Sequence, residues 1–237
     1  MATLTRKELK TDKVSQKVTG LAEFLLNHKQ KLLQAGAAAL LLTVAGLGIF
    51  YYQRSIEAAA GEALGGALVT FHGVVTTTPP VDITVPVFDT AEKKFQQARQ
   101  EFQDVAKTHS GTKAADWAQL YAALSLRELD QLSEAESELN QITNNDSREL
   151  AAQAKMALAG IYHNTNRTSE AEKLYKELID GSPSVTVPKP TVQMSLASLY
   201  LRTDPDQAMR MYQQMSEEYS GTVIGDVVND LLENRSQ

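Results

Sequence analysis

The segment from Ala151 to Pro183 constrains the fold more than any other stretch, because it predicts two helices joined by a short turn. Apolar residues recur at helical spacing on one face of each half: Leu158, Ala159 and Tyr162 in the first, and Ala171, Tyr175 and Leu178 in the second. A polar turn at 164–166 separates the halves, and Pro183 ends the second. One helix pair cannot bury its apolar face alone, so we expect neighbouring pairs.

The same frame recurs on both sides of this segment. Upstream it falls on Ala122, Ala123, Leu126, Ala135, Leu139 and Ile142, and downstream on Leu196, Ala197, Tyr200, Ala208, Tyr212 and Met215. A second self-similarity relates residues 102–116 to residues 212–226, where the sequence Ser-Gly-Thr is repeated at a constant offset of 110. Three units of about 34 residues, allowing for linkers, account for that offset.

These spacings resemble the tetratricopeptide-repeat (TPR) pattern of Leu-Gly-x-x-Tyr, Ala-x-x-x-Phe and Pro, with Ala159 in place of the usual Gly. The resemblance implies an all-α fold, an α-solenoid of helix–turn–helix repeats. It also implies a concave protein-binding groove walled by the first helix of each repeat. The groove-facing positions of the family fall here on Trp117, Leu120, Leu124, Arg127, Gln153, Met156, His163, Asn164, Met194, Leu201 and Arg202. Alternatively, Trp117 and Met194 pack between repeats.

The stretch from Leu32 to Gln53 carries no charge over 22 residues, which is long enough to span a hydrocarbon core of about 30 Å. We therefore predict a transmembrane helix at 32–53, with Tyr51 and Tyr52 at the interface. A cleaved signal peptide is the alternative, since Ala58–Ala60 offers small residues for cleavage. The apolar run, however, exceeds the usual 7–15 residues of such signals.

The charge distribution predicts the orientation of this helix. Residues 1–54 contain 8 basic and 3 acidic residues, a net +5, whereas residues 55–237 contain 15 basic and 26 acidic residues, a net −11. The positive-inside rule therefore places the leader at 1–31 in the cytoplasm and the acidic domain in the periplasm. The leader is expected to be either a solvated tail or an amphipathic helix at 14–26 on an anionic membrane surface.

The remaining chain divides by its helical pattern and its proline-rich breaks. Residues 55–109 are predicted to form a divergent first repeat, interrupted by a Pro/Thr-rich insert at 73–89 in which Val81–Val87 forms either a short strand or a loop. Three TPR-like repeats are expected at 110–221. The segment 222–237 is expected to form a C-terminal capping helix.

The sequence offers no pattern that predicts catalysis. It contains no cysteine, no phosphate-binding Gly-rich loop with Lys and no dinucleotide-binding fingerprint. The four histidines are scattered, without the spacing of a metal site. We therefore expect neither a cofactor nor a metal, and the acidic domain argues against a nucleic-acid partner.

The order of parts, a basic leader, one membrane helix and an acidic TPR-like domain, resembles the ancillary (YfgM-like) subunits of the bacterial SecYEG translocon. That resemblance implies a scaffold on the periplasmic face of the inner membrane that assists secretion or chaperone hand-over. Its partners would be the translocon, periplasmic chaperones or nascent secreted chains. The alternatives are a structural subunit of an envelope or cell-division complex, and an unrecognised enzyme.

Overall fold

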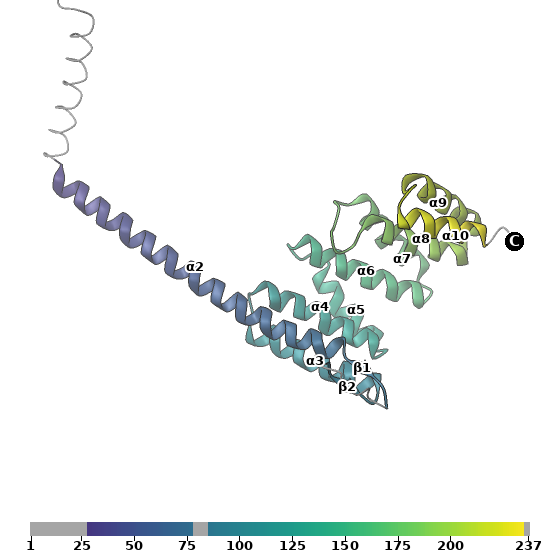
Figure 1. Ribbon diagram of the computed structural model, residues 1–237, viewed down its shortest axis with the longest axis horizontal. Coiled ribbons are helices and arrows are strands. Elements are labelled where there is room, and N and C mark those ends of the chain that lie inside the picture. Colours follow the sequence, from purple (N-terminus) through teal and green to yellow (C-terminus); the bar gives the residue numbers. More distant parts are fainter. Residues whose placement is uncertain (1–27, 78–84, 235–237) are drawn as a thin grey trace, which may run out of the picture. The chain divides into compact units, whose positions relative to one another are not determined.

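The computed structural model describes residues 28–77 and 85–234, and this part of the chain is almost entirely helical (Figure 1). A long helix, α2 (Lys29–Phe71), is followed by two short strands, β1 (Val74–Val75) and β2 (Val87–Phe88). The helices that follow are α3 (Ala91–Thr108), α4 (Lys113–Glu128), α5 (Leu132–Ile142), α6 (Arg148–Asn164), α7 (Thr168–Asp180), α8 (Lys189–Thr203), α9 (Pro205–Glu218) and α10 (Val223–Glu233). The all-α prediction is confirmed.

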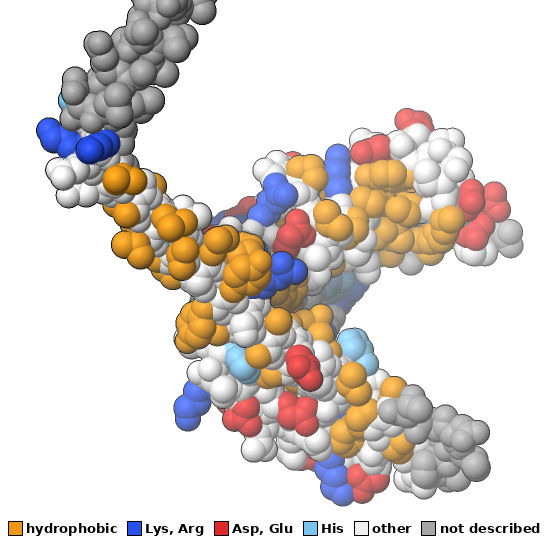
Figure 2. All heavy atoms as spheres, turned by 60° about the vertical axis from the view of Figure 1, so that its left-hand side comes forward, with side chains coloured by type: hydrophobic (Ala, Val, Ile, Leu, Met, Phe, Trp, Pro, Cys, Tyr) orange, Lys and Arg blue, Asp and Glu red, His pale blue; other side chains and the backbone are white. Residues whose placement is uncertain are grey.

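The helix expected at 32–53 begins at Lys29 and continues to Phe71, into the divergent first repeat predicted at 55–109, as one helix, α2. The large apolar side chains in its first part are more than half exposed: Leu33, Leu40, Leu41, Leu42, Val44, Leu47, Ile49, Phe50, Tyr51 and Tyr52. Figure 2 shows them covering this part of the helix. The helix is long and apolar enough to cross a membrane. The amphipathic helix expected at 14–26 lies outside the described residues.

The chain separates into two compact units between Ser55 and Ile56, within α2. In the second unit the end of α2 packs with α3 and α4 in a small core that contains Ala67, Ala98, Phe102, Val105, Ala118 and Ala122. Phe71, the last residue of α2, makes edge contacts with Phe95, Phe102 and Tyr121 at centroid distances of 5.4, 6.0 and 5.5 Å. Such edge-on aromatic contacts add to the stabilisation that burial of apolar area provides.

The insert after α2 returns to the helix end through a short parallel pairing of β1 with β2, in which Val74 lies opposite Val87. Gly73 permits this close approach, because a Cβ there would lie 2.7 Å from the Phe88 ring and 2.9 Å from the Pro86 carbonyl oxygen. Of the stretch Val81–Val87, for which the sequence left a strand or a loop open, Val87 is the one described residue that lies in a strand, and residues 81–84 lie outside the described residues.

From α3 onward each helix packs against the next helix in the chain, and α4 also contacts α6. The residues that recur in the sequence form the core of these helix pairs. Each of the pairs α4–α5, α6–α7 and α8–α9 contains two alanines with no exposed surface: Ala123 and Ala135, Ala159 and Ala171, and Ala197 and Ala208. Since the distance between packed helices depends on the side chains at the contact, these alanines allow close approach.

The connections between helices repeat their geometry as well. Asp130 and Asn166 adopt left-handed backbone conformations with φ of 59° and 60°. Each is followed by an N–H that donates to a carbonyl five residues earlier, Gln131 to Leu126 and Arg167 to Tyr162. Gly111 and Gly221 likewise have φ of 84° and 73°, as turns that precede α4 and α10 require. The shorter turn before α9 differs, because Asp204 caps that helix directly.

The N-terminus of α4 is capped from two sides. Thr112 accepts a hydrogen bond from the Ala115 N–H, while the Glu57 carboxylate of α2 accepts from the Lys113 and Ala114 N–H groups at 3.2 Å each. These three donors would otherwise lack intrahelical partners. The carboxylate also lies at the positive end of the α4 dipole. Glu57 therefore stabilises the contact between α2 and the N-terminus of α4.

We expect Glu57→Ala to lower the free energy of unfolding by about 1 kcal/mol, the typical effect of losing a helix cap. Thermal unfolding of the full chain in detergent, followed by circular dichroism, measures this change. Glu62→Ala is the matched control, since Glu62 is exposed on the same helix. Equal effects of the two substitutions would contradict the capping role.

Candidate protein-binding hollow

An open hollow of about 530 Å³ lies on the surface of the second unit. Three helices, α4, α6 and α8, supply most of its wall, and α7 contributes Tyr175. Its lining residues are Leu124, Arg127, Gln153, Met156, Ala157, Gly160, His163, Asn164, Tyr175, Met194, Ser195 and Ser198. We call this surface the α4–α6–α8 hollow. Its volume falls within the range of about 300–1,000 Å³ that is usual for ligand sites.

Helical spacing explains why these residues share one surface. On α6 the lining positions are 153, 156, 157, 160, 163 and 164, which are three or four residues apart and therefore lie on one face. The opposite face of α6 carries Leu158, Ala159 and Tyr162, which are buried in the core. The residues that hold the helices together thus determine which residues face the hollow.

The hollow combines an apolar part with a basic end. Leu124, Met156 and Met194 are half-buried and pack against the core, and methionine side chains adapt to differently shaped apolar partners. Arg127 and His163 lie in the last turns of α4 and α6. Burial lowers the pKa of His163, and the positive charge of Arg202 lowers it further. His163 is therefore mostly neutral at pH 7.

Gly160 and Tyr175 shape the floor of the hollow. A Cβ placed on Gly160 would meet no atom within 4 Å, so the absent side chain leaves open space there. The Tyr175 side chain is 2% exposed, and burial raises the pKa of its hydroxyl. The neighbouring Ser195 hydroxyl donates to the Thr191 carbonyl oxygen at 3.1 Å.

Hydrogen bonds to Glu149 hold the loop between α7 and α8, residues 181–188, beside the hollow. The Glu149 carboxylate accepts hydrogen bonds from the Ser184 hydroxyl at 2.6 Å, the Thr186 hydroxyl at 2.9 Å and the Thr186 N–H at 3.0 Å. Gln153, which lines the hollow, donates to the Thr186 carbonyl oxygen at 2.9 Å. These bonds favour the ionised form and lower the pKa of Glu149 to about 2, with the Ser184 bond the largest cause.

Seven of the eleven residues predicted to face a groove line this hollow: Leu124, Arg127, Gln153, Met156, His163, Asn164 and Met194. Leu120 was wrongly predicted to be accessible. It is 1% exposed and belongs to the main core, together with buried residues of α5 and α6.

The other three predicted residues lie outside the hollow lining. Trp117 is half-buried and lines a separate hollow of about 430 Å³ with Lys113, Asp116, Asn145, Asp146, Ser147 and Leu150. Leu201 is half-buried against the core. Arg202 is exposed, and its guanidinium donates to the Asn166 side-chain oxygen.

Sequence reasoning missed Ala157, Gly160, Tyr175, Ser195 and Ser198. The two small residues Gly160 and Ser198 follow the lining positions Met156 and Met194 by four residues, so helical spacing could have found them. Tyr175 had been placed in the core, where it is in fact buried, and only the structure shows that it also borders the hollow.

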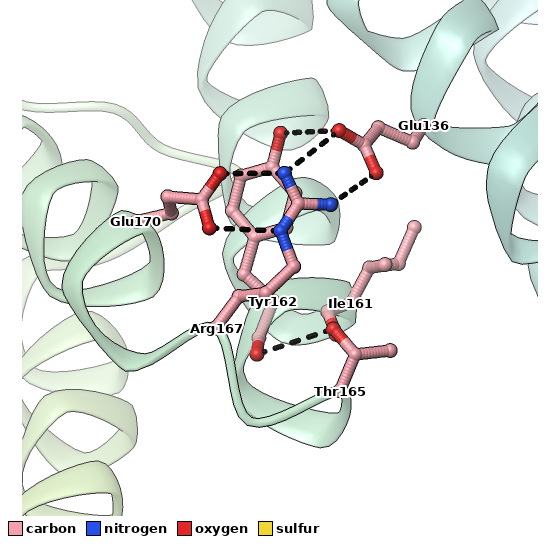
Figure 3. Close-up of polar contacts among 6 residues, drawn as sticks. All are labelled: Glu136, Ile161, Tyr162, Thr165, Arg167 and Glu170. Atoms are coloured by element: carbon pink, nitrogen blue, oxygen red, sulfur yellow. Dashed lines mark hydrogen bonds and ion pairs between the residues drawn. The ribbon is translucent and has the colours of Figure 1, made fainter.

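A second polar cluster joins three helices near the end of α6 (Figure 3). The Arg167 guanidinium donates to both Glu136 carboxylate oxygens, at 2.5 and 3.1 Å, and to both Glu170 oxygens, at 2.5 and 2.8 Å. It also lies 4.0 Å from the centre of the Tyr162 ring, whose hydroxyl donates to Glu136 at 3.0 Å. Bidentate pairing of this kind fixes geometry as well as charge, so the cluster holds α5, α6 and α7 in register.

The Arg167 hydrogen bonds hold the pKa of Glu136 and that of Glu170 below the usual range, while burial raises the pKa of Tyr162. All members of this cluster are engaged with one another, which is characteristic of a structural role. Among the described residues no group of three or more His, Asp or Glu side chains is placed to hold a metal ion.

Comparison with protein-family models, with curated proteins and with solved structures finds no match to this chain.

Because the pKa of Glu149 is depressed on folding, its contribution to stability is full above its ordinary value of 4.5 and is lost as the pH falls towards 2. We therefore expect Glu149→Gln to lower the melting temperature at pH 7 and the difference from the parent chain to vanish near pH 2. Thermal unfolding of the full chain in detergent across this pH range tests it.

Glu134→Gln serves as the control, since Glu134 also lies in the first turn of a helix but is exposed. A difference for Glu149→Gln that stays constant from pH 7 to pH 2, or that matches the control, would contradict the role assigned to this carboxylate.

Proposed function

We propose that this chain is a membrane-anchored protein-interaction scaffold, built as a TPR-like solenoid whose α4–α6–α8 hollow holds a segment of a partner protein. The observation that carries the proposal is the convergence of seven predicted groove residues from three helices on one open, partly apolar surface. Apolar pockets with a few polar groups at their edge are the usual sites of recognition.

Contacts between successive helix pairs support the repeat architecture. The Tyr162 hydroxyl of α6 donates to Glu136 of α5, and the Tyr200 hydroxyl of α8 donates to Glu172 of α7 at 2.7 Å. In both cases a tyrosine on the first helix of one pair bonds a glutamate on the second helix of the preceding pair. Nearest-neighbour contacts of this kind are what a solenoid requires.

Binding accounts for the chemistry of the hollow better than catalysis does. A serine nucleophile needs a base within hydrogen-bond reach. Within the described residues no hydrogen bond joins His163 to Ser195 or Ser198, and Ser195 is already bonded to its own helix. We therefore propose a non-enzymatic role.

The location we propose follows from α2 and from the uneven charge. The exposed apolar part of α2 fits a single membrane span, with the basic leader in the cytoplasm and the acidic unit in the periplasm at the inner membrane. Partners at that site would belong to the secretion machinery: the translocon, periplasmic chaperones or nascent secreted chains.

A photo-crosslinking amino acid at position 156, in the full chain in membranes, tests whether the hollow is occupied by a partner. We expect crosslinks from position 156 that are absent from position 173, which is exposed on α7 outside the hollow. Gly160→Leu, which places a side chain in the open space of the hollow, should remove them.

Mass spectrometry of the crosslinked proteins identifies the partner. Translocon subunits, chaperones or secreted chains would support the secretion role, whereas division or wall-synthesis proteins would favour a structural subunit of an envelope complex. Equal crosslinking from positions 156 and 173, or none from 156, rejects the hollow as the binding site.

A further inference from the structure

We infer that the α4–α6–α8 hollow selects partner segments that combine acidic side chains with large apolar ones. This inference rests on the proposed function and adds the chemistry of the ligand to it.

The first reason is the contrast between the hollow and the rest of its domain. Residues 55–237 carry 26 acidic and 15 basic residues, yet Arg127 is the one charged side chain among the described residues that line the hollow, where it lies with the mostly neutral His163. A surface of this domain chosen at random would carry more carboxylates than cations. The absence of carboxylates from the lining favours a ligand that is negatively charged.

The second reason is the placement of the basic residues at one end of three helices. Arg127, His163 and Arg202 lie in the last turns of α4, α6 and α8, respectively. Arg202 is close enough for its charge to lower the pKa of His163. Arg127, His163 and Asn164 line the hollow, and Arg202 lies outside the lining but near His163.

Local structural roles do not fully occupy the two arginines. Arg127 pairs with its neighbour Glu128 at 2.7 Å, but both side chains are about one-third exposed, and surface pairs of this kind are weak enough to be exchanged. Arg202 donates to a neutral amide oxygen on Asn166. A carboxylate from a ligand would be a stronger acceptor for either guanidinium.

The third reason is the apolar part of the hollow, which favours a ligand that also carries large apolar side chains. Leu124, Met156 and Met194 offer apolar surface in the same hollow as Arg127. The open space over Gly160 can admit a side chain of the ligand. A purely acidic segment would leave this surface exposed to water. A segment with both kinds of side chain would satisfy the two parts of the hollow together.

The test uses the full chain in detergent and three fluorescent peptides of equal length, each blocked at both ends so that no terminal charge contributes. One alternates Asp or Glu with Leu, the second replaces each acid with its amide, and the third replaces each acid with Lys. Fluorescence anisotropy measures the Kd. We expect the acidic peptide to bind at least about tenfold more tightly than the amide peptide, with a Kd that rises with salt.

Arg127→Met and Arg202→Met, together, should weaken binding of the acidic peptide about tenfold while leaving the amide peptide unchanged. Arg210→Met is the matched control, because Arg210 is exposed on α9 and does not line the hollow. Melting temperatures of the variants show whether each remains folded. Gly160→Leu should abolish binding without removing any charge.

Equal binding of the acidic and amide peptides, no binding of the acidic peptide, or no effect of the arginine substitutions would overturn this inference. The proposed function can survive that result, since crosslinks from position 156 would still mark the hollow as occupied by a ligand of another chemistry. Loss of those crosslinks would instead reject the hollow itself.

Discussion

The burial of an alanine on each helix of a pair is the constraint on which the rest of the domain depends. Ala123 and Ala135, Ala159 and Ala171, and Ala197 and Ala208 have no exposed surface in their three pairs. Because the second helix can then lie close to the first, the larger residues beside the alanines are directed between neighbouring pairs. Tyr162 and Tyr200 reach the preceding pair, and the hydroxyl of each donates a hydrogen bond to a glutamate there.

The same packing leaves one face of α4, α6 and α8 uncovered, and that face forms the hollow. Arg127, His163 and Asn164 lie in the last turns of α4 and α6, while Leu124, Met156 and Met194 supply its apolar surface. The Arg167 cluster and the Glu149 bonds fix the helices and the loop around it. The hollow is thus a consequence of the way the pairs stack, and a ligand would meet a surface that is already formed.

Much of this fold could be predicted from the sequence, because the buried residues recur at helical spacing and the turns recur as polar or Gly-containing segments. The accessible residues were harder to predict. Leu120 and Met156 occupy corresponding positions in the repeated frame, yet Leu120 is buried in the main core while Met156 remains in the hollow. Spacing along one helix cannot show which part of its face a neighbouring helix covers. Similarly, the Glu57 cap and the Gly73 contact join residues whose association no local pattern indicates.

Hydrogen–deuterium exchange of the full chain in nanodiscs, with and without a crosslink-identified partner, measures most directly whether the stacked pairs create the binding surface. We predict that the partner slows exchange in segments 153–164 and 191–198, which border the hollow, and leaves α9, which contributes no residue to the lining, unchanged. Slowed exchange confined to α9 or α10, with none in α6 and α8, would contradict the account.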